Sequence, residues 1–239
     1  MGNIMKLSVV IPVYNEEKRI EKTAETLVKF FEKNNLEYEL IFSNDGSLDS
    51  TYKIAKRLEE QNKCIKAVGY EVNKGKGSAV RYGMLKTSGD IVLFTDCDLA
   101  YGVDVIKNAL DVFEKTGADI VIGSRNIAED SYSGYTFTRK LMSKVYFRII
   151  ALVSGFNLSD SQCGFKCFNS KSAYDVFGEC TVDGFAFDLE ALIKAQKKGY
   201  KIAEMPVKIL SNENDESKVN MIKDSVKMLK DIRKIKKSM

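Results

Sequence analysis

A short apolar run that ends at two carboxylates limits what this chain can fold into. Residues 91–94 have the sequence IVLF, and Asp96-Cys97-Asp98 follows after a single threonine. An uninterrupted apolar run with β-branched members is typical of a strand that is buried on both faces, as in a parallel sheet. Folds of the α/β class bind their ligands at the carboxyl ends of such strands. The run therefore predicts a parallel sheet with a ligand site beside Asp96 and Asp98.

These two carboxylates have two interpretations. Burying both without a counter-charge would cost much free energy, and a hard divalent cation that carries phosphate oxygens is a suitable partner. In the alternative, Asp98 caps a following helix and Asp96 is simply exposed to solvent. The first interpretation predicts a Mg²⁺ or Mn²⁺ site for a diphosphate, and the second predicts only the start of a helix.

Strand and helix patterns alternate along the first half of the chain. Strands are expected at residues 7–13, 38–43, 65–72, 91–95 and 119–122, and helices at 17–34, 49–62, 76–87 and 103–116. This alternation predicts a doubly wound α/β layer with parallel strands, whose carboxyl ends line one crevice.

The second half of the chain is less regular. A helix is expected at residues 138–156, a short strand at 163–169, a helix at 187–198 and a last strand at 201–210. Residues 218–237 place apolar side chains three and four apart among lysines, which is typical of a basic amphipathic helix. We find no repeat and no clean linker, so a single domain is expected over residues 1–239.

Composition narrows the chemistry. The chain has no histidine, so catalysis must use carboxylates, cations, hydroxyls or the charge of the substrate itself. The five scattered cysteines indicate reduced thiols in an intracellular protein. With a net charge of +4 from nearly balanced acids and bases, no nucleic-acid partner is expected. No segment reaches the roughly 20 apolar residues of a membrane span.

Five polar segments follow the expected strands. They are PVYNE at 12–16, NDGS at 44–47, NKGKG at 73–77, TDCD at 95–98 and GSR at 123–125. Each is a weak signal alone, because Asn-Asp-Gly is usually a turn and a Gly-x-Gly before a helix is often an ordinary loop. The chain has no GxGxxG after the first strand and no GxxxxGK[ST], which disfavours dinucleotide binding and P-loop NTPase activity.

Taken in order, the motifs PVYNEE, SNDGS, NKGKGSAVRYG, TDCDLA, GSR, DSQCGFK and GFAFDLE resemble those of family-2 inverting glycosyltransferases. The resemblance covers residues 7–235 and is strongest to the polyprenyl- and dolichyl-phosphate glycosyltransferases, in particular the dolichyl-phosphate β-glucosyltransferase branch. It implies a GT-A fold: a single Rossmann-like, doubly wound mixed sheet flanked by helices, with amphipathic helices at the C-terminus. Residues 7–125 would bind the nucleotide-sugar, and residues 126–239 would bind the acceptor and carry the basic C-terminal helix.

The resemblance implies a metal-dependent hexosyltransferase that moves glucose from UDP-glucose to a polyprenyl phosphate, dolichyl or undecaprenyl. The alternative is a family-2 enzyme with another donor, such as GDP-mannose or UDP-N-acetylglucosamine, or with a hydroxyl acceptor in a polysaccharide or glycolipid. A non-catalytic nucleotide-sugar-binding protein is disfavoured because the DxD acids and Lys218 are present. The chain lacks tryptophan and the QxxRW motif, which argues against a processive polysaccharide synthase.

The resemblance also implies roles for single residues. The base and ribose of the nucleotide would be surrounded by Pro12, Tyr14, Glu16 and Asp45. Other parts of the donor would be contacted by Lys76, Gly77, Asp96 and Lys218, with Mg²⁺ or Mn²⁺ held by Asp96 and, more directly, Asp98. The acceptor phosphate would be bound by Arg125, Arg139 and Ser143, beside an acceptor loop with Asp160, Gln162 and Gly164. The residues expected to be catalytic are Asp98, Arg125, Arg139 and Glu190.

A phosphate acceptor suits a site without histidine. A phosphate monoester is already ionised near neutral pH and needs no general base, and arginines bind it through charge-assisted hydrogen bonds. Two acids also have a simpler interpretation that does not involve a ligand. Asp45 could be a residue that forms a turn, and Asp188 could be a solvated acid on a helix. We do not expect Asp188 to be a base.

Residues 138–156 mix apolar side chains with Arg139, Lys140, Lys144 and Arg148, as in a helix that lies in a membrane interface. In the alternative, this helix packs on the sheet or against a second copy in a homodimer. Cations near the C-terminus would add roughly 1 kcal/mol each beside anionic lipid. A cytoplasmic protein bound peripherally to the cytoplasmic face of a membrane is therefore expected.

Overall fold

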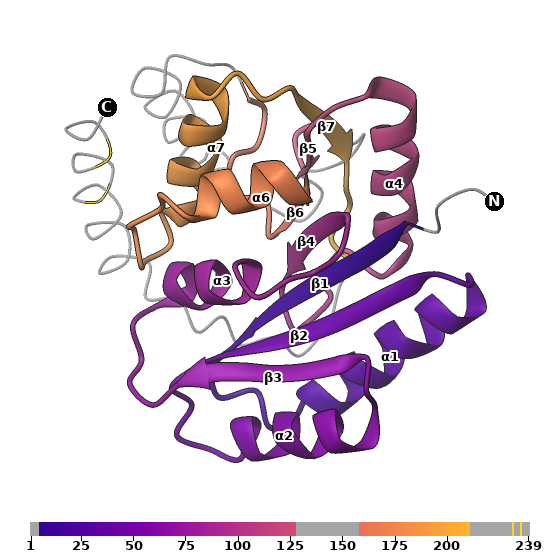
Figure 1. Ribbon diagram of the computed structural model, residues 1–239, viewed down its shortest axis with the longest axis vertical. Coiled ribbons are helices and arrows are strands. Elements are labelled where there is room, and N and C mark those ends of the chain that lie inside the picture. The colour runs from indigo at the N-terminus through magenta and orange to yellow at the C-terminus, as the bar shows by residue number, and fades with distance from the viewer. Residues whose placement is uncertain (1–4, 128–157, 211–230, 232–234, 236–239) are drawn as a thin grey trace.

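A seven-stranded sheet runs through the centre of the protein, in the order β3-β2-β1-β4-β6-β5-β7 (Figure 1). The computed structural model describes residues 5–127 and 158–210, together with Asp231 and Ile235. The strands are β1 (Lys6–Val13), β2 (Glu37–Asp45), β3 (Ile65–Tyr70), β4 (Ile91–Thr95), β5 (Ile120–Ser124), β6 (Phe165–Asn169) and β7 (Ile202–Pro206).

Helices cover both faces of this sheet, as the doubly wound pattern predicts. One apolar cluster joins the sheet to α1 (Ile20–Lys33), α2 (Thr51–Gln61) and α4 (Asp104–Thr116). A second cluster joins the opposite face to α3 (Lys76–Met84), α6 (Ser170–Phe177) and α7 (Phe187–Lys197). Within the described ranges, none of the helices has the length and apolar character needed to cross a membrane.

The first half of the chain confirms the predicted parallel sheet. Strand β1 pairs in parallel with β2 on one side and with β4 on the other, and β2 pairs in parallel with β3. The chain therefore builds outward from β1 to β3 and then returns to the other side of β1. This reversal makes a crevice at the carboxyl ends of β1 and β4, where doubly wound folds bind ligands.

Strand β6 runs against its neighbours and makes the sheet mixed. It is antiparallel to both β4 and β5, whereas β5 and β7 are parallel to each other. Arg125 directly follows β5 and Asp160 lies shortly before β6, and their side chains are 2.6 Å apart. The chain thus leaves β5 and enters β6 at the same edge of the sheet, which makes the two strands run in opposite directions.

Two single elements also differ from the sequence-based expectations: helix α6 and the last strand. Helix α6 was not predicted, because its eight residues are too few for a repeated apolar pattern. Its start is fixed by Asn169, whose side chain accepts a hydrogen bond from the Ser172 amide at 2.7 Å. The expected last strand at 201–210 is shorter and ends at Pro206. The expected helices at 138–156 and 218–237 lie outside the described residues, apart from Asp231 and Ile235, which are helical and buried.

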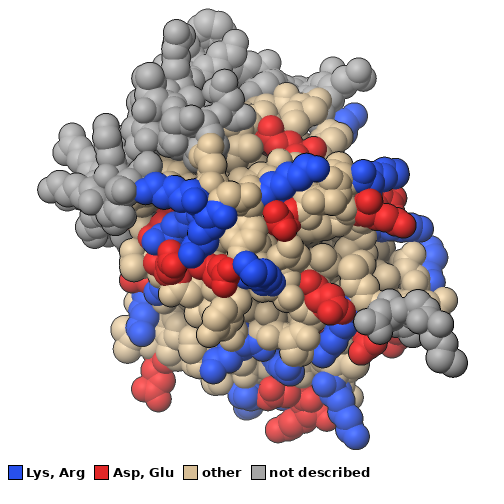
Figure 2. All heavy atoms as spheres, turned by 45° about the horizontal axis from the view of Figure 1, so that its top comes forward, with Lys and Arg blue, Asp and Glu red and all other residues tan. Residues whose placement is uncertain are grey.

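Charged side chains of both signs share the surface. On the face shown in Figure 2, described Lys and Arg residues are interspersed with Asp and Glu rather than gathered by sign. This arrangement agrees with the nearly balanced composition of 37 basic and 33 acidic residues.

Glu39 is the centre of a polar cluster at the edge of the sheet opposite the crevice. Its carboxylate, 3 % exposed, lies 2.6 Å from the Lys66 ammonium and 2.5 Å from the Ser8 hydroxyl, and it accepts a bond from the Ser88 amide. Burial opposes ionisation of Glu39, but these donors outweigh it and lower its pKa from 4.5 to about 2. The ionised cluster therefore stabilises the folded protein.

We predict that Glu39→Gln lowers the free energy of unfolding at pH 7 by about 2 kcal/mol, allowing for screening around the half-exposed Lys66. Because the pKa of Glu39 is lower in the folded state, its contribution is present above pH 4.5 and is lost as the pH falls toward 2. Urea unfolding at pH 7 and pH 3 should show the difference from wild type shrinking at the lower pH. Glu25→Gln, which breaks an exposed pair with Lys29, is the control and should change little. Equal losses at both pH values would contradict this account.

Candidate active site

The loops that follow β1 and β2 are joined into one wall of the crevice. The Asn15 amide donates to the Ser47 hydroxyl at 3.0 Å, and the Leu48 amide donates back to the Asn15 side chain at 2.9 Å. The Glu16 amide also donates to the Thr51 hydroxyl at 2.7 Å. Of the residues expected at the nucleotide, Tyr14 and Glu16 lie on this wall, whereas Pro12 lies near the end of β1; Tyr14 is 37 % exposed.

Asp45 lies at the end of β2 and organises the neighbouring loop. Its buried carboxylate accepts hydrogen bonds from the Tyr70 hydroxyl at 2.7 Å, the Asn73 side chain at 2.9 Å and the amides of Lys74 and Gly75 at 2.9 Å. The Asp45 side chain therefore shapes the loop of residues 70–75, whereas in the Asn-Asp-Gly segment it is Asn44 that accepts a hydrogen bond from the Ser47 amide. A contact between Asp45 and a nucleotide stays a prediction.

The start of α3 is covered by residues 181–187. A Cβ atom on Gly77 would lie 2.5 Å from the Val182 carbonyl oxygen and 2.6 Å from Phe187 Cβ, so only glycine fits there. The Gly77 amide donates to the Asp183 carbonyl at 2.9 Å. Gly77 thus allows the loop to pack closely beside Lys76, and its N–H is already occupied by the protein.

The acidic pair lies where β4 ends. Cys97 points into the core, where it contacts Thr23, and burial raises the pKa of its thiol to about 12. Asp96, 34 % exposed, and the partly exposed Asp98 lie on either side of it. Leu99 has a φ of 49°, which is rare for a bulky residue. The backbone is therefore held in an unfavourable conformation directly after the pair.

Asp98 does not cap a helix, so that alternative is wrong. Helix α4 begins at Asp104, with Val103 at its N-cap. The Asp98 carboxylate instead accepts a hydrogen bond from the Ala100 amide at 3.0 Å, within the turn that follows β4. Burial and the nearby charge of Asp96 raise the pKa of Asp98. Both effects would be offset by a cation at the pair.

Lys76 supplies one cation to this pair. Its ammonium lies 2.5 Å from an Asp96 carboxylate oxygen. Burial disfavours a charged Lys76, but the carboxylates of Asp96 and Asp188 outweigh it and raise the pKa of Lys76. Lys76 therefore lies beside the acidic pair, and the contact expected between Lys76 and a donor stays a prediction.

The donor set also fits a hard divalent ion. Asp96 and Asp98 offer carboxylate oxygens, the ligands that Mg²⁺ and Mn²⁺ prefer. Over the ranges that the structure describes, three or more acidic, cysteine or histidine side chains nowhere gather in a metal-binding group. An ion at the pair would therefore take most of its ligands from water and from phosphate oxygens.

Arg125 is fixed in a fork at the end of β5. Its Nε and Nη2 atoms donate to the two carboxylate oxygens of Asp160 at 2.6 and 2.9 Å. Burial works against both charges, but their pairing lowers the pKa of Asp160 and raises that of Arg125. Asp160 is fully buried and holds the partly exposed Arg125 in place, and the acceptor-binding role expected of Asp160 stays a prediction. The Gln162 amide donates to Asp160 at 3.2 Å.

The segment from Asp160 to β6 joins this arginine to the acidic pair. A Cβ atom on Gly164 would lie 2.4 Å from an Asp96 carboxylate oxygen, so glycine allows the backbone to approach Asp96 closely. Asp160 binds Arg125 at one end of the same segment. The expected donor acids and the expected acceptor arginine are thus neighbours of one short stretch of chain.

Lys166 and Asp188 form a buried ion pair that sequence reasoning missed. The Lys166 ammonium is inaccessible to solvent and lies 2.6 Å from the Asp188 carboxylate. The interpretation of Asp188 as a solvated acid is therefore wrong. A charged residue within the apolar strand sequence FKCFN was the available signal, because a buried lysine requires a partner.

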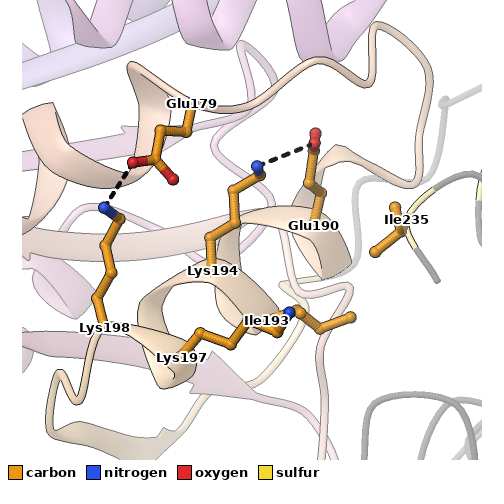
Figure 3. A pocket seen from close by; sticks show the side chains of 7 residues that line it. All are labelled: Glu179, Glu190, Ile193, Lys194, Lys197, Lys198 and Ile235. Atoms are coloured by element: carbon orange, nitrogen blue, oxygen red, sulfur yellow. Dashed lines mark hydrogen bonds and ion pairs between the residues drawn. The ribbon is translucent and has the colours of Figure 1, made fainter. Parts of the chain in front are cut away.

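Glu190 faces away from the acidic pair. Residues two apart on a helix point in nearly opposite directions, and Asp188 takes the side toward Lys166. The Glu190 carboxylate accepts bonds from the amides of Thr181 and Val182 at 2.9 and 2.8 Å. It lies 3.8 Å from the Lys194 ammonium and lines a hollow of about 160 Å³ on α7 (Figure 3). The structure does not bring Glu190 to Asp98, and its catalytic role stays a prediction.

Three other expected site residues lie outside the described part of the chain. They are Arg139, Ser143 and Lys218. The described site consists of the joined loops, the acidic pair with Lys76, and the fork at Arg125.

The chain is similar in sequence to known glycosyltransferases. Residues 8–177 match the family model Glycosyl transferase family 2. The chain is 34% identical over 238 residues to dolichyl-phosphate beta-glucosyltransferase ALG5A of Trichomonas vaginalis, which covers 96% of this chain and 72% of that protein. It is 31% identical over 244 residues to the dolichyl-phosphate beta-glucosyltransferase of Saccharomyces cerevisiae, covering 95% and 72% of the two chains.

The fold is also found in solved structures. Glucosyl-3-phosphoglycerate synthase from Mycobacterium tuberculosis, in complex with Mn²⁺, UDP and phosphoglyceric acid, matches with a TM-score of 0.69 and 19% identity, over 97% of this chain and 77% of that one. Mannosyl-3-phosphoglycerate synthase from Rubrobacter xylanophilus matches with a TM-score of 0.62 and 17% identity, over 97% and 72%. The chain therefore belongs to glycosyl transferase family 2 and is a glycosyltransferase with the GT-A fold.

Proposed function

We propose that this enzyme transfers a hexose, in the first place glucose from UDP-glucose, to a polyprenyl phosphate. The observation that carries the proposal is the placement of the acidic pair and the Arg125 fork beside one segment, residues 160–164. The names of the relatives, dolichyl-phosphate beta-glucosyltransferases, support this acceptor and this sugar. The fold relative that binds Mn²⁺ and UDP supports a uridine nucleotide.

In the proposed donor complex, the wall with Tyr14 and Glu16, together with Pro12, receives the nucleotide. Asp96 and Asp98 would hold Mg²⁺ or Mn²⁺, which supplies positive charge to the leaving diphosphate. Lys76 adds a second cation from the start of α3, and Lys218 is proposed to add another. The wall, the acidic pair and the two lysines would thus bind and orient the donor.

In the proposed acceptor complex, Arg125 binds the phosphate of the lipid together with Arg139 and Ser143. Asp160 keeps the guanidinium of Arg125 in a fixed orientation through two hydrogen bonds. A phosphate oxygen then attacks the sugar carbon from the face opposite the diphosphate and inverts it, through an oxocarbenium-like transition state. The phosphate is already ionised, so no protein group has to remove a proton.

A hydroxyl acceptor, or GDP-mannose or UDP-N-acetylglucosamine as the donor, remains the alternative. A hydroxyl would need a general base within hydrogen-bond reach. Among the described residues, Asp188 is bound to Lys166, Glu190 to backbone amides and Asp160 to Arg125. These pairings favour an acceptor that carries its own charge.

A polyprenyl acceptor also implies a place of action. Its lipid tail cannot leave the bilayer, so we propose that the enzyme binds peripherally to the cytoplasmic face of a membrane. The basic and apolar composition of residues 138–156 and 218–237 supports this proposal.

The direct test is a transfer assay with the full chain, Mg²⁺, UDP-[¹⁴C]glucose and polyprenyl phosphate in detergent micelles. We predict label in the lipid phase, and we predict that Asp98→Asn lowers the rate by about a hundredfold or more. The melting temperature of this variant should match wild type, because Asp98 makes a single hydrogen bond to the described part of the chain, within a turn. If label reached the lipid only from GDP-mannose or UDP-N-acetylglucosamine, the proposed donor UDP-glucose would be wrong. No label in the lipid from any of the three donors would refute the acceptor.

The Arg125 fork is tested by replacing both of its partners, so that no buried carboxylate remains unpaired. We predict that Arg125→Met with Asp160→Asn raises the KM for polyprenyl phosphate 10- to 100-fold, since a hydrogen bond to a charged group contributes roughly 1.5–3 kcal/mol. The calorimetric affinity for UDP should stay unchanged.

The matched control is Arg57→Met with Glu21→Gln, an exposed ion pair between α1 and α2, which should leave both values unchanged. A fall in UDP affinity as large as the rise in the KM for polyprenyl phosphate would place Arg125 in the donor site instead of the acceptor site.

A further inference from the structure

The two residues of the Arg125 fork are held by their neighbours in the chain as well as by each other. Ser124 and Asn126 flank Arg125, and Ser159 directly precedes Asp160. The hydroxyls of Ser124 and Ser159 are hydrogen-bonded to each other at 2.5 Å, and the Asn126 side chain donates to the Ser159 carbonyl oxygen. The loops that carry the arginine and its carboxylate are therefore joined directly beside the fork.

This junction ends on one carboxylate, that of Glu204. Glu204 lies on β7, which pairs in parallel with β5 at one edge of the sheet (Figure 1). Its Oε1 atom accepts a hydrogen bond from the Ser159 amide at 2.9 Å and another from the Ser159 hydroxyl at 2.7 Å. Glu204 therefore holds both the backbone and the side chain of the residue that precedes Asp160.

The number of protons fixes the direction of these hydrogen bonds. The Ser159 hydroxyl has a single proton and a carboxylate can only accept, so this proton points to Glu204. The Ser124 hydroxyl must then donate to Ser159, and its own oxygen accepts from the Asn126 amide at 3.2 Å. An acceptor at position 204 thus orients a continuous chain of hydrogen bonds that reaches the backbone next to Arg125.

The orientation of Arg125 depends on this backbone. Its amide donates to Asp160 Oδ2 at 3.1 Å, and the same oxygen accepts from its Nε atom at 2.6 Å. A shift of either loop would therefore break the fork and turn the partly exposed guanidinium. Ser124 and Asp160 are fully buried, so water has little access to replace a bond that is lost there.

Strand pairing does not account for Glu204. The ladder between β5 and β7 runs from Ile120 to Ser124, and the Val207 amide donates to the Ser124 carbonyl oxygen at 3.0 Å. These bonds use backbone groups and need no carboxylate. Glutamate is uncommon in strands, and this one is spent on the loop that carries Asp160.

We propose that Glu204 is a positioning residue for the acceptor: through Ser159 and Ser124 it keeps the Arg125 guanidinium in the orientation that binds a phosphate monoester. This inference rests on the proposed function, because it requires that Arg125 binds the acceptor phosphate. Glu204 acts through the fork and needs no contact of its own with donor or acceptor.

Two substitutions of Glu204 test the hydrogen bonds directly, in the transfer assay with polyprenyl phosphate in detergent micelles. Glu204→Met removes the acceptor atom, and we expect the KM for polyprenyl phosphate to rise roughly tenfold while the calorimetric affinity for UDP stays unchanged. Glu204→Gln keeps an oxygen that can accept both bonds, so its KM should stay within about twofold of wild type. A wild-type KM in Glu204→Met, or an equal rise in both variants, would overturn the proposal.

A mutant cycle shows whether Glu204 acts through the fork. In the background Arg125→Met/Asp160→Asn, Glu204→Met should raise the KM for polyprenyl phosphate no further, because the group that it positions is absent. Multiplied increases would place the action of Glu204 elsewhere and would overturn the proposal. If Glu204→Met does not fold, Ser159→Ala takes its place, since it removes only the middle hydroxyl. The KM should rise in that variant too, and an unchanged KM would overturn the proposal.

Two further measurements separate the possible failures. Glu39→Gln removes a buried carboxylate far from the fork and should lower stability without raising the KM for polyprenyl phosphate. An equal rise in this control would make the effect of Glu204→Met a consequence of lost stability and would overturn the proposal. Wild type that transfers no sugar to polyprenyl phosphate would refute the proposed function itself. Wild type that does, with a normal KM in Glu204→Met, would refute only the role of Glu204.

Discussion

The need to compensate carboxylates at the carboxyl ends of the strands governs the arrangement of this site. Asp96, Asp160 and Asp188 gather there, and each is paired with a cation from a distant part of the chain. Burial makes an unpaired charge costly, so these pairs determine where the loops can lie. Asp98 has no such ion pair among the described residues, and its pKa is raised by burial and by Asp96. The remaining negative charge of the site is therefore concentrated where a divalent ion would bind.

The segment between Asp160 and Lys166 connects Arg125 to the acidic pair and to Asp188. At one end it binds Arg125, at Gly164 it contacts Asp96, and at Lys166 it anchors Asp188. The reversed direction of β6 is what brings these three contacts to a single edge of the sheet.

Much of the fold could be predicted from the sequence because it is encoded locally. Apolar runs and helical spacing indicated the strands and helices of the first half, and the acidic pair was correctly expected where β4 ends. The partners of charged residues could not be found in this way. Lys166 and Asp188 are 22 positions apart and meet only because β6 runs antiparallel under α7. The FDLE motif points to Glu190, but the rotation of the helix turns Asp188 toward Lys166 and Glu190 toward the amides of Thr181 and Val182.

The central claim is that an ionised phosphate, held by arginine, attacks a sugar whose diphosphate is bound at the acidic pair. The anomeric configuration of the product tests it most directly. UDP-glucose labelled with ¹³C at the reacting carbon would be converted in the presence of polyprenyl phosphate, and the product would be examined by ³¹P and ¹³C NMR. The account predicts a ¹³C–³¹P coupling in a β-linked glucosyl phosphate. An α-linked product, or a glycoside in which the labelled carbon has no phosphorus coupling, would contradict it.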